Sequence, residues 1–171
     1  GSNITNGGDR NTATGVNALL YTETGNANVA SGFDALTNNV GGNDNVALGT
    51  QALVTNVSGN SNVSVGYQSL LVSTSSNNIA MGYKAGNAIT SGSNNTVIGS
   101  LPGTSSMADT VLIGAGTTER LKVDATGLYV NGAPVTSIAA SEDFMNERIR
   151  EAVEPLIAQI AALTKQVNAN I

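Results

Sequence analysis

Between residues 11 and 99 the chain repeats one pattern, in which an asparagine is followed by three mostly small or apolar residues and then a glycine. Asn45-Val-Ala-Leu-Gly49 is typical, and successive asparagines lie 17, 17, 17, 16 and 17 residues apart. The apolar, small, apolar alternation inside a unit is typical of a short β-strand. Helical-pair repeats and propeller blades need about twice this period or more. The pattern therefore predicts a mainly β fold, a parallel β-roll or β-solenoid over residues 3–116 with one coil per repeat.

A column of asparagines, a column of glycines and a column of leucines run in register through the repeat. We expect the asparagines to form hydrogen-bonded ladders between coils and the glycines to supply turns or close backbone approach. The polar columns are Asn11, Gly15, Asn28, Gly32, Asn45, Gly49, Asn62, Gly66, Asn78, Gly82, Asn95 and Gly99. A leucine follows each of the first four glycines by four residues, at Leu19, Leu36, Leu53 and Leu70. Because so thin a roll buries little, we expect the leucine and valine columns to face solvent on at least one side and to need cover from neighbouring chains.

After Gly99 the repeat decays through residues 100–109, which we interpret as an insertion. A solenoid cap or junction is the simpler account of this segment, and a binding loop is the alternative. Residues 117–138 contain two short alternating segments and the turn signal Asn131-Gly132, which predict a small β neck. The charged residues of this segment are expected to form a solvated strand face: Glu119, Arg120, Lys122 and Asp124.

Residues 141–170 contain no glycine and begin with a helix start signal, Ser141 followed by two acidic residues. Apolar residues then alternate steps of four and three, which predicts a parallel coiled coil that continues through Pro155. The predicted seam is Ile149, Val153, Leu156, Ile160, Leu163 and Val167. The β-branched and leucine positions favour a dimer, whereas an additional apolar residue, Ile157, favours more strands, so the heptads leave the number open. Asn146 is placed where a buried polar ring could fix the register.

The repeat units, together with the segments after them, resemble a known class of fibre protein. The segments "NTATGVNAL", "NVALGTQAL" and "NVSVGYQSL", followed by "ERLKVDATGLYVNG" and a coiled coil, resemble tail-fibre and related fibre proteins of bacteriophages. They are similar, more loosely, to the head repeats of trimeric autotransporter adhesins. The resemblance implies a homotrimer in an extracellular virion fibre, with neighbouring virion proteins and a host cell-surface glycan or protein as partners. A bacterial cell surface is the alternative location.

Composition narrows the classes of function. Seven basic and twelve acidic residues give a formal charge of -5, the opposite of what nucleic-acid binding requires. The chain has neither cysteine nor histidine, so we expect no metal site and no cofactor. No apolar run approaches the roughly 20 residues that span a bilayer, and we expect no membrane insertion. Gly1 and Ser2 are typical of a cloning remnant.

Candidate chemistry is sparse. Glycan cleavage needs two carboxylates roughly 5–10 Å apart, whereas Asp9, Glu23, Asp34 and Asp44 are scattered over different coils, so we expect no enzyme. Aromatic residues recur one position after the repeat glycine, where they form either a packing ladder or a surface on which sugars stack. The candidate receptor contacts are Phe33, Tyr67, Tyr83, Ser100, Leu101 and Pro102.

The sequence thus predicts a structural and receptor-binding fibre segment that presents three equivalent sites to a host surface. A bacterial surface adhesin head and a monomeric ice-binding solenoid are the alternatives. The absence of a regular threonine column counts against ice binding.

Overall fold

A computed structural model describes residues 8–135, 147, 149–151, 153–162 and 165 of the chain. The chain divides into two compact units, Gly1–Pro134 and Val135–Ile171. The repeats and all ten strands belong to the first unit, and the described helical residues belong to the second.

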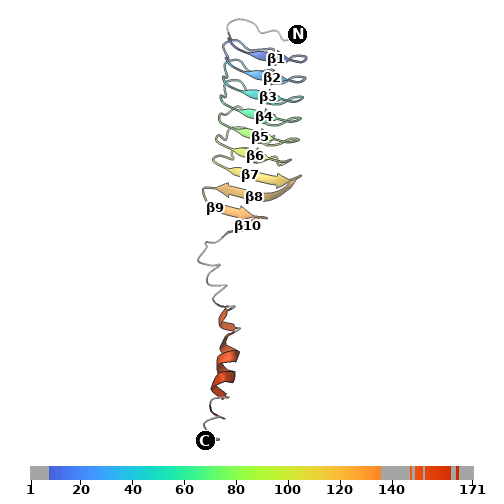
Figure 1. The fold of residues 1–171 in the computed structure, drawn as a ribbon. Helices are drawn as coiled ribbons and strands as arrows, with labels where there is room; N and C mark the ends of the chain where they lie inside the picture. Colours follow the sequence, from blue (N-terminus) through green and yellow to red (C-terminus); the bar gives the residue numbers. More distant parts are fainter. Residues whose placement is uncertain (1–7, 136–146, 148, 152, 163–164, 166–171) are drawn as a thin grey trace. The chain divides into compact units, whose positions relative to one another are not determined.

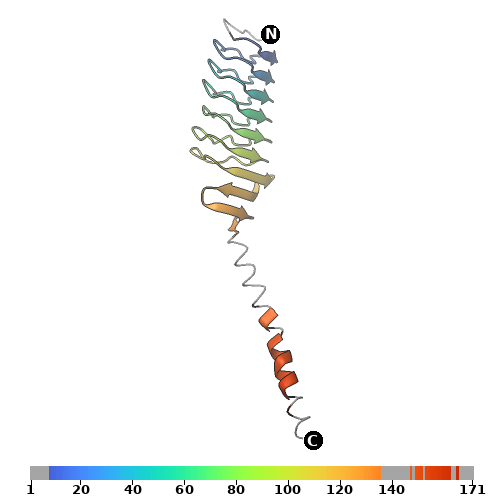
Figure 2. The ribbon, with the colours of Figure 1, turned by 60° about the vertical axis from the view of Figure 1, so that its left-hand side comes forward.

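The first unit contains one β-sheet in which the strands follow one another in chain order (Figure 1). The pairs from β1 to β7 are parallel, and those from β7 to β10 are antiparallel. Figure 2 shows the short parallel strands stacked along one side of the coils. The strands are β1 (Thr12–Thr14), β2 (Val29–Ser31), β3 (Val46–Leu48), β4 (Val63–Val65), β5 (Ile79–Met81), β6 (Thr96–Ile98), β7 (Val111–Ala115), β8 (Thr118–Asp124), β9 (Gly127–Val130) and β10 (Ala133–Pro134). The predicted mainly β parallel solenoid is confirmed.

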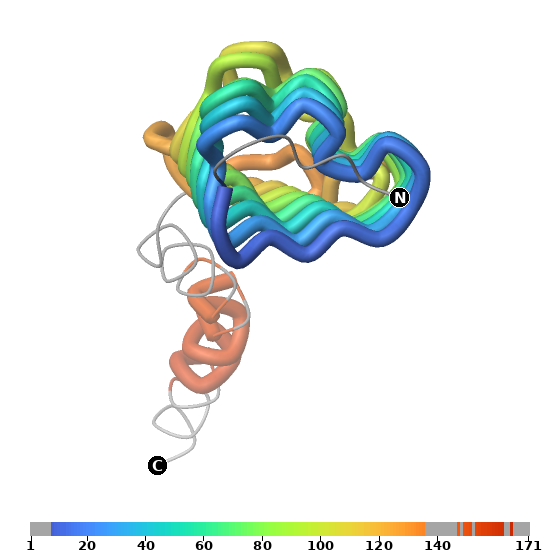
Figure 3. The backbone as a smooth tube through the Cα atoms, turned by 90° about the horizontal axis from the view of Figure 1, so that it is seen from above, coloured from blue at the N-terminus to red at the C-terminus, as the bar shows by residue number. Residues whose placement is uncertain are grey.

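The core lies inside the coils, which superimpose when seen along the stack (Figure 3). Each three-residue strand points its central residue inward, and Ala30, Ala47, Ser64 and Ala80 are fully buried. Strand side chains alternate between the two faces of a sheet, which places the central residue of each strand in the interior. The central residue is small in β2 to β5, whereas Val97 and Leu112 fill the same position in β6 and β7.

The leucine column is buried, and the expectation that it faces solvent is wrong. Leu19, Leu36, Leu53 and Leu70 are completely inaccessible and form most of the large side-chain volume of the core. Their φ angles lie between 45° and 54°, in the left-handed region. The leucines lie in the turn that follows each strand and its glycine, and because they are buried there, one chain closes around its own leucines. A partner chain is not needed to cover this column.

The predicted asparagine ladder is confirmed and runs through the interior from Asn11 to Asn95. The Asn45 amide Nδ2 donates to Asn28 Oδ1 at 3.1 Å and to the Gly59 carbonyl at 2.9 Å. Asn45 Oδ1 accepts from both the backbone nitrogen and Nδ2 of Asn62, each at 3.0 Å. Burying an amide is costly unless its hydrogen bonds are made. The repeated geometry makes them at every coil.

The repeat glycines allow the backbone of one coil to pack directly against the backbone of the next coil. Gly49 has a φ of 133°, and a Cβ atom added there would lie 2.7 Å from the carbonyl oxygen of Gly66 in the next coil. A side chain at this position would push the coils apart. The predicted role of these glycines in turns and close approach is thereby confirmed.

Residues 100–109 form the short coil between β6 and β7, the last parallel pair of the sheet, which agrees with the predicted cap or junction, whereas the interpretation as an insertion is wrong. The step from Asn95 to Thr110 is 15 residues, whereas the earlier steps are 16 or 17. Thr110 takes the ladder position, and its backbone nitrogen donates to Asn95 Oδ1 at 3.2 Å. The sequence motif decays here because the coil is shortened and threonine replaces asparagine, although the stack continues.

The two segments predicted after the repeat are strands of the same sheet. β8 pairs with the last parallel strand, β7, and β9 and β10 follow by short turns, the second at Asn131-Gly132. The strands are thus present as expected within residues 117–135. A separate β neck is not shown, and residues 136–138 lie outside the described part of the chain.

The described helical residues of the second unit are 147, 149–151, 153–162 and 165, and they include Pro155. Ile149, Val153, Leu156 and Ile160 are exposed by between 42% and 63%. Ser141, Asn146, Leu163 and Val167 lie outside the described side chains, and the coiled coil stays a prediction. Among the residues that the structure describes, no helix is both long and apolar enough to cross a bilayer.

Candidate functional site

The outward side of the sheet carries two columns of mainly apolar side chains, interrupted in β6 by Thr96. The first and third residues of each short strand point away from the core, opposite the buried central residue. This surface, the outer apolar face, consists of Val29, Val46, Leu48, Val63, Val65, Ile79, Met81, Ile98, Val111, Ile113, Leu121, Val123, Leu128 and Val130. Its side chains are half-buried or exposed.

The outer apolar face continues without a break where the sheet changes from parallel to antiparallel. Val111 pairs with Val123, which pairs with Leu128, and this set continues the first column. Ile113 pairs with Leu121, which pairs with Val130, and continues the second. One apolar surface therefore extends over β2 to β9.

No charged residue occupies the two columns, whose other members are Thr12, Thr14, Ser31 and Thr96. None of the described contacts places another segment over these columns. Large contiguous apolar patches on soluble chains mark surfaces that pack against a partner. The outer apolar face is therefore the strongest candidate for an interaction surface.

The aromatic column lies one position beyond the repeat glycines. The rings of Tyr67 and Tyr83 stack with centroids 5.5 Å apart and an interplanar angle of 15°, and Lys84 Nζ lies 5.4 Å from the Tyr83 centroid. Phe33 lies two coils before Tyr67, with Thr50 between them in the column. The tyrosines therefore form the packing ladder, and they remain 41% and 57% exposed. Sugar contact at this column stays a prediction.

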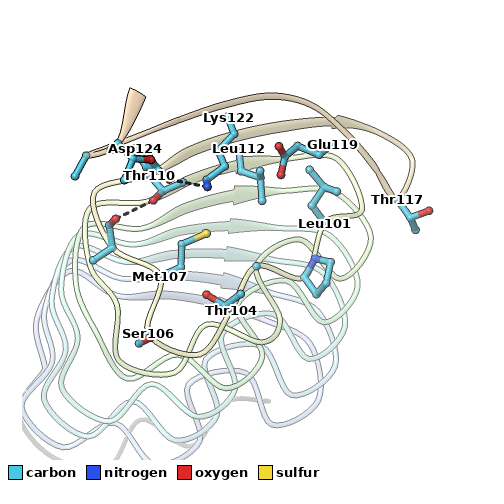
Figure 4. Close-up of a pocket in the computed structure, with 15 residues that line it drawn as sticks. Leu101, Thr104, Ser106, Met107, Thr110, Leu112, Thr117, Glu119, Lys122 and Asp124 are labelled. Atoms are coloured by element: carbon cyan, nitrogen blue, oxygen red, sulfur yellow. Dashed lines mark hydrogen bonds and ion pairs between the residues drawn. The ribbon is translucent and has the colours of Figure 1, made fainter. Parts of the chain in front are cut away.

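A pocket of about 670 Å³ opens beside the last coil, between the segment that follows Ser100 and strand β8 (Figure 4). Leu101, Met107 and Leu112 supply its apolar surface. Of the predicted receptor contacts, Leu101 and Pro102 line this end pocket, whereas Ser100 and the three aromatic residues do not. Its polar lining is Thr104, Ser106, Thr110, Thr117, Glu119, Lys122, Asp124 and Thr126.

A β-bulge in β8 brings Glu119 to the same side as two later charged residues of the strand. Ile113 pairs with Leu121 but Gly114 pairs with Glu119, so Arg120 is an additional residue between the two pairs. A bulge reverses the facing of the residues before it. Glu119 therefore lies on the same side as Lys122 and Asp124, with all three lining the pocket.

The expectation that the charged residues of β8 form a solvated face is wrong for one ion pair. Lys122 Nζ lies 2.6 Å from Asp124 Oδ2, and the two side chains are only 33% and 17% exposed. Arg120, on the other hand, is exposed and donates to Asn131 Oδ1 at 3.1 Å. Two adjacent charged residues, Glu119 and Arg120, interrupt the alternation of β8, and this is the signal that could have indicated the bulge.

The turn after β8 holds Asp124 in its ionised form. Asp124 accepts hydrogen bonds from the Lys122 amine and from the hydroxyl and backbone nitrogen of Thr126, which hold the pKa of the carboxyl well below its ordinary 3.8. The same hydrogen bond to Asp124 raises the pKa of Lys122 above its ordinary 10.5. The positive charge of Lys122 is thereby committed to Asp124.

No protein-family model, curated protein or solved structure matches the chain. Within the residues that the structure describes, no group of three or more acidic side chains is arranged to hold a metal ion. The candidate functional surfaces are therefore the outer apolar face and the end pocket.

Proposed function

We propose that this chain is a structural and receptor-binding segment of a bacteriophage fibre, and that it assembles as a homotrimer through the outer apolar face. The observation that carries this proposal is the continuity of that face over β2 to β9. Its two columns repeat at the strand spacing of about 4.8 Å. A second copy of the chain in parallel register offers apolar side chains at the same spacing, so the columns of neighbouring copies interdigitate.

The helix of the second unit supports the same assembly. Ile149, Val153, Leu156 and Ile160 are spaced as a heptad seam and are exposed in the single chain. A parallel coiled coil buries such a seam. The number three comes from the resemblance of the repeat to trimeric fibres, since the heptad pattern alone leaves dimers and trimers open.

Attachment follows from the repetition of one surface in three copies. Three weak sites on one rigid body bind a multivalent surface far more tightly than one site does, provided that they engage together. In this proposal a host cell-surface glycan or protein is the receptor, neighbouring virion proteins are the other partners, and the fibre is extracellular and has no enzymatic activity. A bacterial adhesin head with the same architecture is the alternative.

Sedimentation equilibrium tests the assembly. The chain mass is 17.2 kDa, and we expect the native mass of three chains. Met81→Glu places a charge in the outer apolar face and should lower the mass to that of one chain, because a buried unpaired carboxylate opposes association. Val57→Glu is the matched control, since Val57 is 46% exposed, Met81 is 45% exposed and Val57 lies outside the strands.

A single-chain mass for the unaltered protein would contradict the proposal and would favour the monomeric ice-binding alternative. Equal effects of Met81→Glu and Val57→Glu would show that the outer apolar face is not the interface.

A further inference from the structure

The end pocket exists because the last coil has no complete coil above it. Up to β7 each coil is covered by the next, but the chain then turns back into β8, which covers only one side. Met107 of the short coil is only partly buried and faces the pocket, whereas Leu101 and Leu112 also line it but are only 5% and 6% exposed (Figure 4). Its volume of about 670 Å³ falls within the range of small-ligand sites.

The lining combines an apolar floor with hydroxyl groups at the rim. Leu101, Met107 and Leu112 are joined in the lining by Thr104, Ser106 and Thr117, whose hydroxyls make no described hydrogen bond, whereas the Thr126 hydroxyl already bonds to Asp124 and Tyr129. A hydroxyl group both donates and accepts hydrogen bonds. Such a lining fits a ring that has an apolar C–H face and a polar hydroxyl edge, which is the chemistry of a sugar.

The charged side chains in the pocket lining determine whether a cationic or an anionic sugar is favoured. Lys122 and Asp124 neutralise each other across 2.6 Å. Glu119 is in no ion pair among the described residues, but its charge also acts on Lys122 and helps to raise the pKa of that amine. Two carboxylates and one amine give the pocket lining a net charge of -1, which favours a cationic ligand over an anionic one.

We propose that the end pocket binds an amino sugar, with the protonated amine at Glu119 and the ring against Met107. The proposal deepens the proposed function, because it names the chemical class of the receptor glycan and rests on that function for its biological role. Sialylated and sulfated glycans are excluded as ligands by the same charge argument.

Methionine methyl NMR on the full chain tests the binding directly. Met107 lies in the pocket and Met81 lies on the outer apolar face, so the two methyl groups report on separate surfaces. Titration with glucosamine trisaccharide in mildly acidic buffer, where the amine is protonated, should shift the Met107 signal and leave Met81 unchanged. The N-acetylated trisaccharide should bind more weakly, and sialyllactose should not bind.

The variant Glu119→Gln keeps the shape of the side chain and removes its charge. We expect its affinity for glucosamine trisaccharide to fall about tenfold, as for loss of one charge-assisted hydrogen bond, and its affinity for the N-acetylated analogue to stay unchanged. Glu23→Gln, outside the pocket, is the control and should bind as the unaltered chain does.

Three outcomes would overturn the pocket proposal: an unmoved Met107 signal, equal affinity of Glu119→Gln and the unaltered chain, or tighter binding of sialyllactose. Sedimentation of the same samples separates this proposal from the proposed function. A three-chain mass without binding would reject the amino sugar alone, whereas binding by a single-chain species would support the pocket and reject the trimeric fibre.

Discussion

The stack depends on glycine wherever the backbones of two coils touch. Gly49 has a φ of 133° and contacts the backbone of Gly66, whereas Gly127 has a φ of 139° and has nothing within 4 Å of an added Cβ. Gly127→Ala should therefore cost only backbone strain, about 1–3 kcal/mol. Gly49→Ala adds a steric clash to the same strain and should lower the free energy of unfolding by more. Chemical denaturation of both variants checks this, and equal losses would show that strain alone explains the glycine.

Two buried threonines differ in whether the side-chain hydroxyl makes a hydrogen bond. Thr22 is fully buried and its Oγ1 makes no hydrogen bond, whereas Thr37 Oγ1 donates to the Asn17 carbonyl at 3.0 Å. Thr22→Val should raise the free energy of unfolding by about 1 kcal/mol, because it removes an unsatisfied hydroxyl without changing shape. Thr37→Val should lower it by about the same amount. Thermal unfolding measures both, and a loss of stability in Thr22→Val would contradict the argument.

For single residues, the sequence predicted which side chains hydrogen-bond to each other, but it did not predict which side chains point into the coil. The spacing of Asn28, Asn45 and Asn62 was enough to predict a ladder, because an amide can bond to its equivalent only if the period is regular. The inward direction of Leu53 was not predicted. It depends on a left-handed backbone turn that leucine rarely adopts, and no local preference for that conformation exists in the residue itself.

The turn that closes β8 is held by the ionised form of Asp124. Because its pKa is depressed in the folded protein, its contribution to stability is present above the unfolded pKa and is lost as the pH falls toward the folded value. The backbone nitrogen of Thr126 donates to this carboxylate at 2.8 Å, so its amide resonance reports the titration. We expect an NMR midpoint below the ordinary 3.8.

Asp124→Asn is the control for this titration, since it keeps an acceptor for Thr126 and removes the proton exchange. The low-pH step in the Thr126 resonance should disappear in this variant. A midpoint at or above 3.8 in the unaltered chain would show that the hydrogen bonds do not favour the carboxylate.

The β-strands were predicted well where the alternation of apolar and small residues was regular, and the facing of side chains was predicted poorly where the alternation was interrupted. The strands of units such as Val46–Leu48 and Val63–Val65 follow from alternation alone. The facing of Glu119 does not, since one bulge residue at Arg120 shifts the side on which every preceding residue lies. The position of Glu119 in the lining of the end pocket was missed for that reason.

Nearest-neighbour stacking gives the first unit a modular length. Each coil pairs only with the coils before and after it, as in other solenoids. Deleting residues 46–62 removes one whole period and joins Asn45 to Val63, so the columns stay in register. We expect this shortened chain to fold with an unchanged amide NMR spectrum for coils away from the junction.

Deleting residues 46–54 is the matched control, because about half a period is lost and the asparagine ladder is displaced from its partners. This variant should lose the β spectrum in circular dichroism. Folding of both deletions, or of neither, would contradict nearest-neighbour register as the basis of the stack.

For the whole molecule, the sequence predicted the solenoid and a valine column on its outside, but it wrongly placed the leucine column on the outside as well. Self-association stays a prediction. Repeat spacing fixes which residues lie above one another, whereas the direction of each column depends on the shape of the closed coil. Once that shape places Leu36 and Leu70 inside, the outer apolar face is the surface left for a partner.

The hydrogen bonds between coils run along the stack, while the covalent chain runs around it. A tensile load applied along the stack is therefore carried in series by one set of inter-coil bonds after another. Each set that gives way releases about 17 residues, or roughly 55 Å of extended chain. Under such a load we expect the coils to unfold one at a time, so that mechanical work is absorbed in steps while the remaining coils stay folded.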